Sequence, residues 1–386
     1  MKKIGILTYM KEYSNLGTNM QAYCTLKAIQ KVYPDGQVEL INYSAWKPAM
    51  RPYLSAISFN SLKNDYIRIR KYSRFFKKEL TLSKKKLISS NVRKSLEFIK
   101  KQEYDAIYVG SDTVLELKGA GRDDLTAYWL DNAIDSKKFL IAASCHNVVY
   151  EALSEGQRDL MSKAVEGFSL LGVRDEPTFR LLSRLTLPGD RRLQIIPDPT
   201  FTYEIDYSFA EEYLGKKKLA LIRPVVCLHL LRGSKWGGDL ANYFRKEGYM
   251  IASLRPAYYA DITLTDLSPF EQMGIYKYFT LVITHRFHDS IFCFKNLTPV
   301  IAFPEHVSDV TVYGESKMLS LFRSFNLEKI NYIENNEDIT AKYLFDMHKE
   351  AITNVGQKKE VIKNTVRKEK EKYESFIKES RSITMQ

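Results

Sequence analysis

Seven consecutive residues, Thr284 to Ser290, form the densest group of chemically reactive side chains in the sequence. They follow an apolar run and precede a helical pattern, so we expect them at a turn between a strand and a helix. Arg286 and His288 are two residues apart, and in extended backbone this spacing directs both side chains to one side. A guanidinium and an imidazole beside a helix N-terminus can bind a phosphate or a carboxylate, and the imidazole can transfer a proton near neutral pH. The alternative is a purely structural helix start, with Asp289 or Ser290 as its cap.

A second candidate anion site is the basic loop from Arg232 to Asp239, which lies between an apolar strand and a helical pattern. Its glycines allow backbone amides to converge on an anion, and Arg232 and Lys235 add positive charge. The alternative is an ordinary surface loop in which Asp239 caps the helix.

Two further polar loops follow strands in the first part of the chain. Gly110, Ser111 and Asp112 end one apolar run, and a loop from Glu12 to Gln21 follows the first strand. Asp112 is a candidate general base or ligand of a sugar hydroxyl, and the alternative is an Asx-turn residue. Ligands of open α/β sheets bind at the carboxyl ends of the strands, where all four loops are expected.

The elements that must position these loops alternate between strands and helices. The start of the chain predicts a strand, a loop, a helix and a second strand, which is a βαβ unit. The alternation restarts after about residue 216, so we expect two α/β halves joined around residues 201–218. The expected strands fall in residues 3–9, 37–43, 104–112, 138–144, 193–200, 225–231, 250–256, 279–286 and 298–304. Residues 169–182 are expected to form a strand, a turn and the start of a helix. Further helices are expected in 20–34, 237–249 and 287–297.

The end of the chain, from about Thr340 to Arg381, is expected to be mostly helical. Its apolar residues form one stripe on an otherwise charged helix, so the stripe needs a partner to pack against. We therefore expect this tail to pack back toward the first half.

Composition excludes several classes of protein. With 386 residues, of which 45% are hydrophobic and 12% aromatic, the chain is expected to form two or three globular domains rather than a disordered protein. Its four cysteines lie far apart without CxxC spacing, which favours buried thiols over a zinc ribbon or a disulfide scaffold. The sequence contains no metal-ligand motif, Walker loop, GxGxxG, HExxH or GxSxG. No apolar run suits a secretory leader or a membrane-spanning helix, so we expect a reduced, cytoplasmic protein.

Positive charge is concentrated in one segment. The formal net charge is +12, and residues 63–101 alone carry 14 Lys or Arg against 3 Asp or Glu. Basic residues interleaved with Tyr and Phe suit an anionic lipid surface or a pyrophosphate-bearing acceptor, and the alternative is a solvated helical face. No nucleic acid is expected as a partner, because no nucleic-acid-binding fold signature accompanies the segment.

Taken together, these segments resemble the polysaccharide pyruvyl transferase family over nearly the whole chain. The resemblance rests on the order and spacing of short motifs. They are an N-x-G element before L-Q-A-Y-A-L, a basic F-x-x-F and L-x-L-S stretch, Y-D-x-x-x-V-G-S-D-Q-V-W, A-A-S, V-R-E, D-P-T and R-x-H-G, which fall at residues 15–26, 70–85, 104–115, 142–144, 173–175, 198–200 and 286–289.

Four positions depart from the family pattern. Thr113 and Leu115 stand where the family has Gln and Trp, Asp289 follows R-x-H in place of Gly, and Ile141 replaces the Tyr that usually precedes A-A-S. The changes at Thr113, Leu115 and Asp289 alter loops that face ligands in the implied fold.

The resemblance implies a GT-B-like α/β fold, with two Rossmann-like domains facing across a cleft. These would be residues 1–205 on the acceptor side and 206–340 on the donor side, followed by a helical tail over 341–386. It also implies transfer of a pyruvyl group from phosphoenolpyruvate to two hydroxyls of a sugar, which makes a cyclic ketal without a cofactor.

Roles for individual residues follow from the resemblance together with the charges of the loops. His288 is the expected acid and base. The expected ligands of phosphoenolpyruvate are Arg286, Arg232, Lys235 and His285, and those of the acceptor are Gly17, Asn19, Gln21, Ser111 and Asp112. The implied acceptor is a polysaccharide or its lipid- or nucleotide-linked precursor. The basic segment adds the expectation that the protein contacts the inner face of the membrane peripherally.

Two other functions stay open. A sugar-nucleotide glycosyltransferase of the same architecture would need an acidic residue that grips a ribose, and Glu305 is the candidate for it. A non-catalytic family member that binds glycans would be consistent with the four departures.

Overall fold

The structure is a computed structural model, and it describes residues 1–13, 15–45, 62–117, 125–145, 148–219, 223–230, 236–304, 316–334 and 339–386. The chain divides into two compact units. Unit 1 comprises Met1–Ser55, Arg74–Tyr203 and Glu369–Gln386, and unit 2 comprises Ala56–Ser73 and Glu204–Lys368. These units differ from the domains expected from the sequence in two respects. The sequence analysis assigned residues 56–73 to the first domain, and it treated residues 341–386 as a separate tail.

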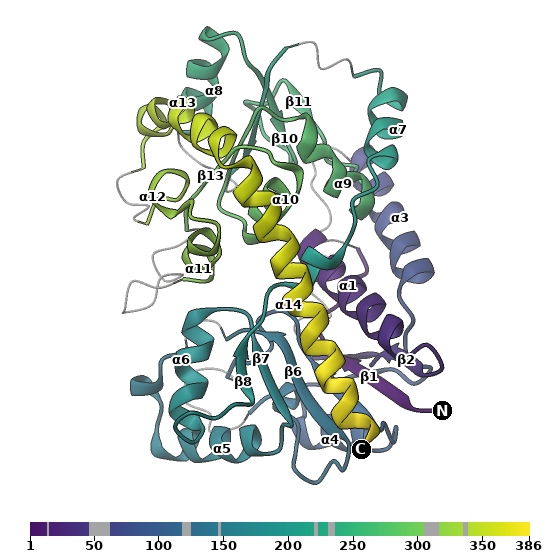
Figure 1. The fold of residues 1–386 in the computed structure, drawn as a ribbon. Coiled ribbons are helices and arrows are strands. Elements are labelled where there is room, and N and C mark those ends of the chain that lie inside the picture. Colours follow the sequence, from purple (N-terminus) through teal and green to yellow (C-terminus); the bar gives the residue numbers. More distant parts are fainter. Residues whose placement is uncertain are drawn as a thin grey trace. The chain divides into compact units, whose positions relative to one another are not determined.

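Unit 1 is built on a six-stranded parallel sheet with the strand order β2-β1-β5-β6-β7-β8 (Figure 1). Most of its strand residues are buried, as expected of parallel strands that are covered on both faces. The strands are β1 (Lys3–Leu7), β2 (Gln37–Leu40), β5 (Ala106–Val109), β6 (Lys137–Ala143), β7 (Leu170–Val173) and β8 (Leu193–Ile195), and a separate parallel pair joins β3 (Tyr43–Ser44) to β4 (Leu87–Ile88).

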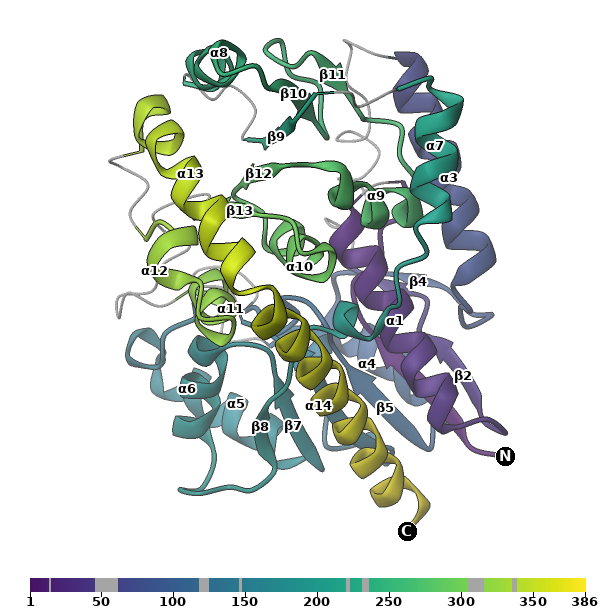
Figure 2. The same ribbon diagram turned by 45° about the horizontal axis from the view of Figure 1, so that its top comes forward.

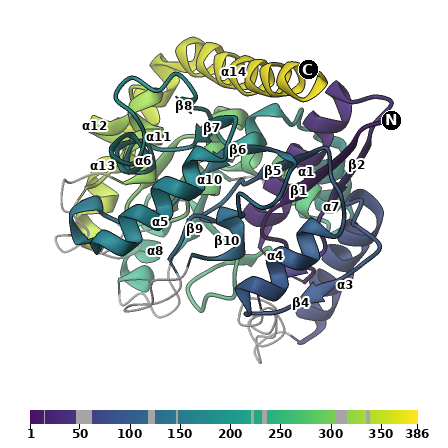
Figure 3. The same cartoon turned by 90° about the horizontal axis from the view of Figure 1, so that it is seen from below.

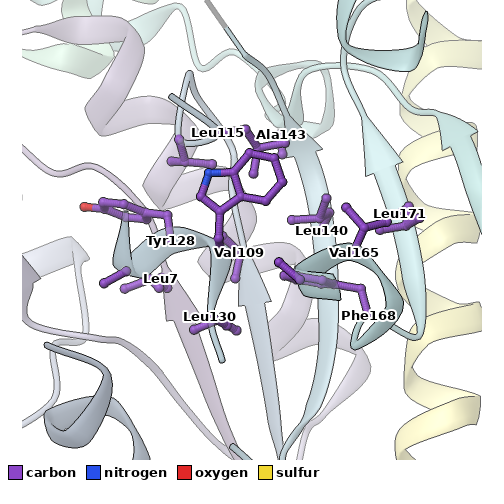
Figure 4. Close-up of a cluster of buried hydrophobic side chains, with 14 of the residues drawn as sticks. Leu7, Val109, Leu115, Tyr128, Leu130, Leu140, Ala143, Val165, Phe168 and Leu171 are labelled. Carbon is purple, nitrogen blue, oxygen red and sulfur yellow. The ribbon is translucent and has the colours of Figure 1, made fainter. Parts of the chain in front are cut away.

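Helices cover both faces of this sheet (Figure 3). On one face lie α4 (Val92–Lys100), α5 (Glu155–Glu166) and α6 (Glu176–Leu185), and on the other lie α1 (Leu16–Val32) and the C-terminal part of α14 (Lys359–Met385). Figure 4 shows the core under the first group, where Leu7, Val109 and Leu140 of the strands meet Val165 and Phe168. The sheet is therefore enclosed by apolar contacts on this face.

α1 begins four residues earlier than its apolar spacing predicts. Asn15 is the N-cap, with a φ of 74° and a side chain that accepts a hydrogen bond from Thr18 N at 3.2 Å. Asn tolerates this left-handed backbone because its short amide bonds locally. The residues from Gly17 to Gln21 consequently belong to the first turns of a helix, and not to the loop in which the sequence pattern placed them.

Unit 2 holds a five-stranded parallel sheet with the order β11-β10-β9-β12-β13 (Figure 2). The core on one face joins the strands to α8 and α13, for example through Phe244 and Leu344. On the opposite face α10 packs against β9 and β12, as the contacts described below show. The elements are α8 (Gly237–Lys246), α10 (Phe287–Asn296), α13 (Ala341–Gln357), β9 (Val225–His229), β10 (Met250–Ser253), β11 (Ile262–Thr263), β12 (Leu281–Thr284) and β13 (Val300–Ala302).

The remaining helices are short, except for α3. They are α3 (Leu62–Glu79), α7 (Ser208–Lys216), α9 (Pro269–Ile275), α11 (Lys317–Ser324) and α12 (Glu328–Asn331), with 3-10 turns η1 (Ala127–Trp129), η2 (Tyr150–Ala152), η3 (Pro199–Thr202) and η4 (Tyr276–Tyr278). In unit 2, α9 packs against α7, and Lys71 Nζ of α3 lies 2.6 Å from Glu271 Oε2 of α9. The first part of α3 is thus tied to unit 2.

The C-terminal tail forms two helices, because α13 ends at Gln357 and α14 begins at Lys359. From Glu369 onward α14 belongs to unit 1. There the Tyr373 hydroxyl lies 3.1 Å from Thr25 Oγ1, and Phe376 is 2% exposed. Among the described residues, no helix combines the length and the apolar character needed to cross a membrane.

Candidate functional site

Three neighbouring strands of unit 2 end in polar residues at one edge of the sheet. β9 ends at His229, and β12 ends at Thr284, which His285 and Arg286 follow. Arg255 lies two residues beyond the end of β10. Because β10, β9 and β12 are adjacent and parallel, their carboxyl ends meet at the edge where α/β sheets bind ligands.

The side chain of His229 lies on the α10 face of the sheet. Val226 and Leu228 of β9 belong to the core beneath α8 and α13. Successive side chains of a strand alternate between faces, so Cys227 and His229 lie on the other face. Thr284 is the register partner of His229 on β12. Both residues therefore meet the first turn of α10.

Asp289, in that first turn, is the centre of a buried hydrogen-bond network. Its Oδ2 lies 2.6 Å from His229 Nδ1 and accepts from the Thr284 hydroxyl at 2.8 Å. Its Oδ1 accepts from the Tyr276 hydroxyl at 2.7 Å. Asp289 is 3% exposed and His229 is 4% exposed. The residue that replaces the glycine expected after R-x-H thus joins two strands, a helix and a 3-10 turn.

The charges of this network follow from its contacts. Burial acts to raise the pKa of Asp289, but His229, Arg286 and the Tyr276 hydroxyl outweigh it, so the pKa lies below the usual range. Burial lowers the pKa of His229, with support from Arg286 and Arg255, although Asp289 opposes the shift. The pair therefore consists of a carboxylate and a neutral imidazole. Since an ionised carboxylate only accepts, the imidazole proton is on Nδ1.

His285 is a second neutral imidazole at the same edge. Its ring lies 6.4 Å, centre to centre, from the rings of both His229 and Phe303. Burial, followed by the effects of His229 and Arg286, lowers its pKa to about 3. His285 consequently contributes no positive charge at neutral pH.

Arg286 is the N-cap of α10 and the cation at the centre of this edge. Its backbone is extended, with φ −102° and ψ 126°, and its amide donates to the Thr284 hydroxyl at 3.0 Å. Its enclosed Nε–H has no acceptor among the described residues. The guanidinium and the first amides of the helix can therefore bind an anion together.

His288 is positioned differently from the sequence-based expectation. Extended backbone ends at Arg286, because Phe287 is already the first residue of α10. Arg286 and His288 are therefore not paired by strand alternation. The His288 ring packs against Phe287 and Phe292, with ring centres 5.4 and 6.3 Å away. The expected caps are also corrected, since neither Asp289 nor Ser290 is the N-cap.

Sequence reasoning missed two residues of this edge. Arg255 Nη1 donates to the Leu230 carbonyl at 3.1 Å, which holds the guanidinium beside the end of β9. His229 lies inside an apolar run, so the sequence pattern indicated only a residue of a buried strand. The usable signal in both cases is a polar residue at, or just after, the end of a buried strand.

Other expected donor ligands cannot be placed. Arg232 and Lys235 lie outside the described residues, and so does Glu305, the candidate ribose ligand. Asp239 lies in the first turn of α8, whose N-cap is Trp236, so it does not cap the helix as the alternative predicted.

In unit 1, the expected acceptor residues on α1 make buried structural contacts. Asn19 exchanges two hydrogen bonds with the backbone of Lys11, at 3.1 and 2.7 Å. Gln21 Nε2 donates to Asp198 Oδ2 at 2.6 Å. Gly17 is buried in the first turn. These contacts fix the loop after β1 and join α1 to the end of the sheet.

Asp112 is the one charged residue among the five expected acceptor residues, and the other four are buried. Its Oδ2 accepts from the Thr18 hydroxyl at 3.0 Å, its Oδ1 accepts from Thr113 N at 2.8 Å, and it is half-buried. Ser111 is fully buried, with its carbonyl bound by the Thr8 hydroxyl. Gly110 has a φ of 124°, and a Cβ there would lie 2.1 Å from the Ile141 carbonyl oxygen. The loop is therefore held against β6, with Asp112 at its outer side.

Three of the resemblance motifs, A-A-S, V-R-E and D-P-T, form a buried polar layer in unit 1. Arg174 Nη1 lies 3.0 Å from Asp198 Oδ2, and both side chains are at most 2% exposed. Ser144 donates to Asp175 Oδ2 at 2.5 Å, and Asp175 also N-caps α6 through Thr178 N. These residues join strand ends to helix starts, so their motifs stabilise the fold at this edge.

The family model of the polysaccharide pyruvyl transferases matches residues 15–306 of this 386-residue chain. The chain belongs to the polysaccharide pyruvyl transferase family. The matched region contains β9, β10, β12 and α10, and therefore every residue of the edge described above. No curated protein sequence matches the chain significantly.

Solved structures similar to this family member share its fold at low sequence identity. UDP-GlcNAc 2-epimerase from Methanocaldococcus jannaschii is 11% identical with a TM-score of 0.52, and the match covers 92% of each chain. Anabaena Alr3699/HepE in complex with UDP is 10% identical with a TM-score of 0.51, and the match covers 100% of this chain and 99% of that one. This likeness concerns the fold alone, which is an α/β fold of the GT-B type with parallel sheets. Membership of the family indicates a transferase.

Proposed function

We propose that this chain transfers a pyruvyl group from phosphoenolpyruvate to two hydroxyls of a sugar, forming a cyclic pyruvate ketal. The acceptor is a polysaccharide or its lipid- or nucleotide-linked precursor. The proposal is supported by family membership, and the observation that carries it is the cationic edge formed by Arg255 and Arg286 at the ends of β10 and β12.

Phosphoenolpyruvate suits this edge because it is small and carries both a phosphate and a carboxylate. Arg286 has an unused Nε–H and lies at the N-terminus of a ten-residue helix. Arg255 adds a second guanidinium, and a guanidinium binds carboxylate or phosphate with two parallel hydrogen bonds. We assign Arg286 and Arg255 to the donor, and keep Arg232, Lys235 and His285 as further proposed ligands.

The reaction needs two proton transfers from the sugar. One hydroxyl oxygen adds to C2 of the enol while C3 receives a proton and becomes a methyl group. The second hydroxyl oxygen then replaces the phosphate at C2, and the C2–O bond to phosphate breaks. One hydroxyl proton thus balances the new methyl hydrogen, and the other leaves with the phosphate. We assign protonation of C3 to His288, which is half-buried beside the N-terminus of α10.

The acceptor is assigned to unit 1. Asp112 keeps an accessible carboxylate at the end of β5 and bonds to Thr18. A carboxylate in this position can accept a hydrogen bond from a sugar hydroxyl. Ser111, Gly17, Asn19 and Gln21 support the loop and helix turn that hold it. The assignment of Asn19 and Gln21 is therefore to positioning, and that of Asp112 to direct contact.

The basic segment suits an acceptor that carries a pyrophosphate at a lipid surface. Its residues from 74 onward belong to unit 1, and ten of its basic side chains there are exposed: Arg74, Lys77, Lys78, Lys84, Lys85, Lys86, Arg93, Lys94, Lys100 and Lys101. Clustered exposed Lys and Arg attract anionic headgroups. We propose a peripheral contact with the inner face of the membrane through these residues.

The test combines binding with turnover. Calorimetric titration with phosphoenolpyruvate, and phosphate release with a panel of lipid- and nucleotide-linked sugars, should both be positive for the wild type. Binding of a nucleotide sugar without binding of phosphoenolpyruvate would replace the proposal with a glycosyltransferase. Glycan binding without turnover of either donor would identify a non-catalytic member of the family.

A further inference from the structure

The His229–Asp289 pair is built like a proton-transfer unit, and nothing in the proposed roles uses it. Asp289 accepts three hydrogen bonds, from His229, Thr284 and Tyr276. Three donors from three different elements fix both oxygens of the carboxylate. The carboxylate in turn fixes the tautomer and the ring orientation of His229, as a buried acid does for a catalytic histidine.

The free atom of this pair is Nε2 of His229. The described residues bond to Nδ1 alone, and the register pairing with Thr284 leaves the ring at the carboxyl end of β9, on the α10 face. With its proton on Nδ1, a neutral imidazole presents a lone pair at Nε2, which is the atom that accepts a proton in general-base catalysis. Arg255 and Arg286 interact electrostatically with the same ring, so Nε2 belongs to the edge assigned to the donor.

We propose that His229 is a second proton-transferring side chain of this enzyme and that Asp289 is its positioning residue. His229 Nε2 takes the proton of an attacking sugar hydroxyl as that oxygen bonds to C2 of the pyruvyl group. It then gives this proton to the departing phosphate. His288 protonates C3, and the proton of the second hydroxyl restores His288. The reaction moves two hydroxyl protons, and each of the two histidines accepts one of them. This inference rests on the proposed function for the identity of the substrate.

The groups that face His229 determine its protonation. They are Asp289 from α10, Arg286 at the start of α10, Arg255 after β10 and His285 after β12. The two guanidiniums and burial favour the neutral ring, and only the carboxylate favours the charged one. His229 is thus kept as a base at neutral pH, with Asp289 limiting how weak a base it becomes.

The decisive variant is His229→Asn. An asparagine amide nitrogen occupies nearly the place of the imidazole Nδ1, so it still donates to Asp289, but no atom replaces Nε2. We expect His229→Asn to bind phosphoenolpyruvate with wild-type affinity and to release phosphate about 100-fold or more slowly. His348→Gln is the matched control, because His348 is also buried in unit 2 but packs against Phe345 and Phe244 of the α8–α13 core. It should turn over at the wild-type rate.

Asp289→Asn provides the positioning test. Loss of the carboxylate removes the one charge that raises the pKa of His229, so the acid limb of the pH–rate profile should move to lower pH. Imidazole nitrogen NMR of the wild type should find the His229 proton on Nδ1, and the deshielding of that proton should be smaller in Asp289→Asn, because an amide oxygen is a weaker acceptor than a carboxylate.

Two results separate the inference from the proposed function. Absence of phosphoenolpyruvate binding and turnover in the wild type overturns the proposed function, and the inference with it. Wild-type turnover together with an unimpaired His229→Asn variant, or a His229 proton found on Nε2, overturns the inference alone.

Discussion

His229 and Thr284 are register partners on neighbouring parallel strands, and both hydrogen-bond to the same carboxylate oxygen, Oδ2 of Asp289. The pairing places them side by side on the α10 face, and the first turn of α10 brings the carboxylate to both. The Thr284 hydroxyl also accepts from the Arg286 amide, so one hydroxyl links the carboxylate to the helix start. The edge of this sheet is therefore a connected polar unit.

Removing this carboxylate should destabilise unit 2. Asp289→Ala leaves the Thr284 and Tyr276 hydroxyls and His229 Nδ1–H without their buried acceptor, which should cost about 3–5 kcal/mol. Asp289→Asn should cost less, because its amide oxygen still accepts. Calorimetric melting measures both variants. The control is Asp346→Ala, which removes an exposed ion pair with Lys342 and should change stability by less than about 0.5 kcal/mol. Equal effects of the alanine variants at positions 289 and 346 would contradict the network.

Arg286→Ala and Arg255→Ala should each weaken binding of phosphoenolpyruvate by about 10- to 150-fold. Each substitution removes a charged hydrogen-bonding group, and such groups contribute roughly 1.5–3 kcal/mol. Calorimetric titration gives the affinities. Arg323→Ala is the control, because Arg323 is exposed on α11. If the Arg255 variant binds as well as the control, that side chain serves only to hold the Leu230 carbonyl.

The sequence predicted the strands of both sheets except β11, and the strand–turn–helix at Arg286, because buried parallel strands appear as short apolar runs bounded by polar loops. Helix starts were less well predicted. α1 begins at Leu16, and its N-cap Asn15 has a left-handed backbone that depends on a local hydrogen bond from Thr18 N, which apolar spacing does not encode. The break at Lys358 likewise interrupts a continuous helical pattern without Pro or Gly at the break itself.

Site residues were found where they stand in polar loops and were missed where they stand in apolar runs. His229 appeared to be part of a buried strand, and its role emerges only from pairing with β12 and from Asp289 sixty residues later. Asp289 appeared to be a departure from the family pattern, but its three donors come from elements that sequence spacing cannot bring together. The sequence alone does not show which residues of β9, β12 and α10 come together, although it shows their types.

Stability should fall in mild acid because of His285. Its pKa is lowered by burial to about 3 from the ordinary 6.5. Between these values the unfolded chain binds a proton that the folded chain does not, so stability is complete above about pH 6.5 and declines below it. The slope is up to about 1.4 kcal/mol per pH unit. Calorimetric melting from pH 7.5 to 4.5 should give a shallower decline for His285→Gln than for the wild type. Identical slopes would contradict a buried, neutral His285.

Binding to anionic vesicles should depend on Lys84, Lys85 and Lys86, which are exposed in the basic segment. Exposed charges are screened beyond about 8–10 Å at physiological ionic strength, so sedimentation with phosphatidylserine vesicles should fall as salt rises. The triple Gln variant should bind less than the wild type. The control variant changes Lys359, Lys368 and Lys372 to Gln, so it loses as much positive charge as the first triple variant. It should nevertheless bind as the wild type does. Equal sedimentation with neutral and anionic vesicles would show that the segment is a solvated surface without preference for anionic lipid.

The end of α14 should be essential to the stability of unit 1. Phe376 is 2% exposed and packs so closely that a Cβ on Gly172 of β7 would lie 2.7 Å from its Cζ. Phe376→Ala removes a ring from this contact and should cost about 3–5 kcal/mol. Tyr373→Phe removes only the hydroxyl that bonds to Thr25, and should cost about 1 kcal/mol. The control on the same helix is Val361→Ala, at a 45% exposed position, which should stay within about 0.5 kcal/mol of the wild type. If calorimetric melting finds Phe376→Ala as stable as Val361→Ala, then the contacts of α14 with the first sheet do not form in solution.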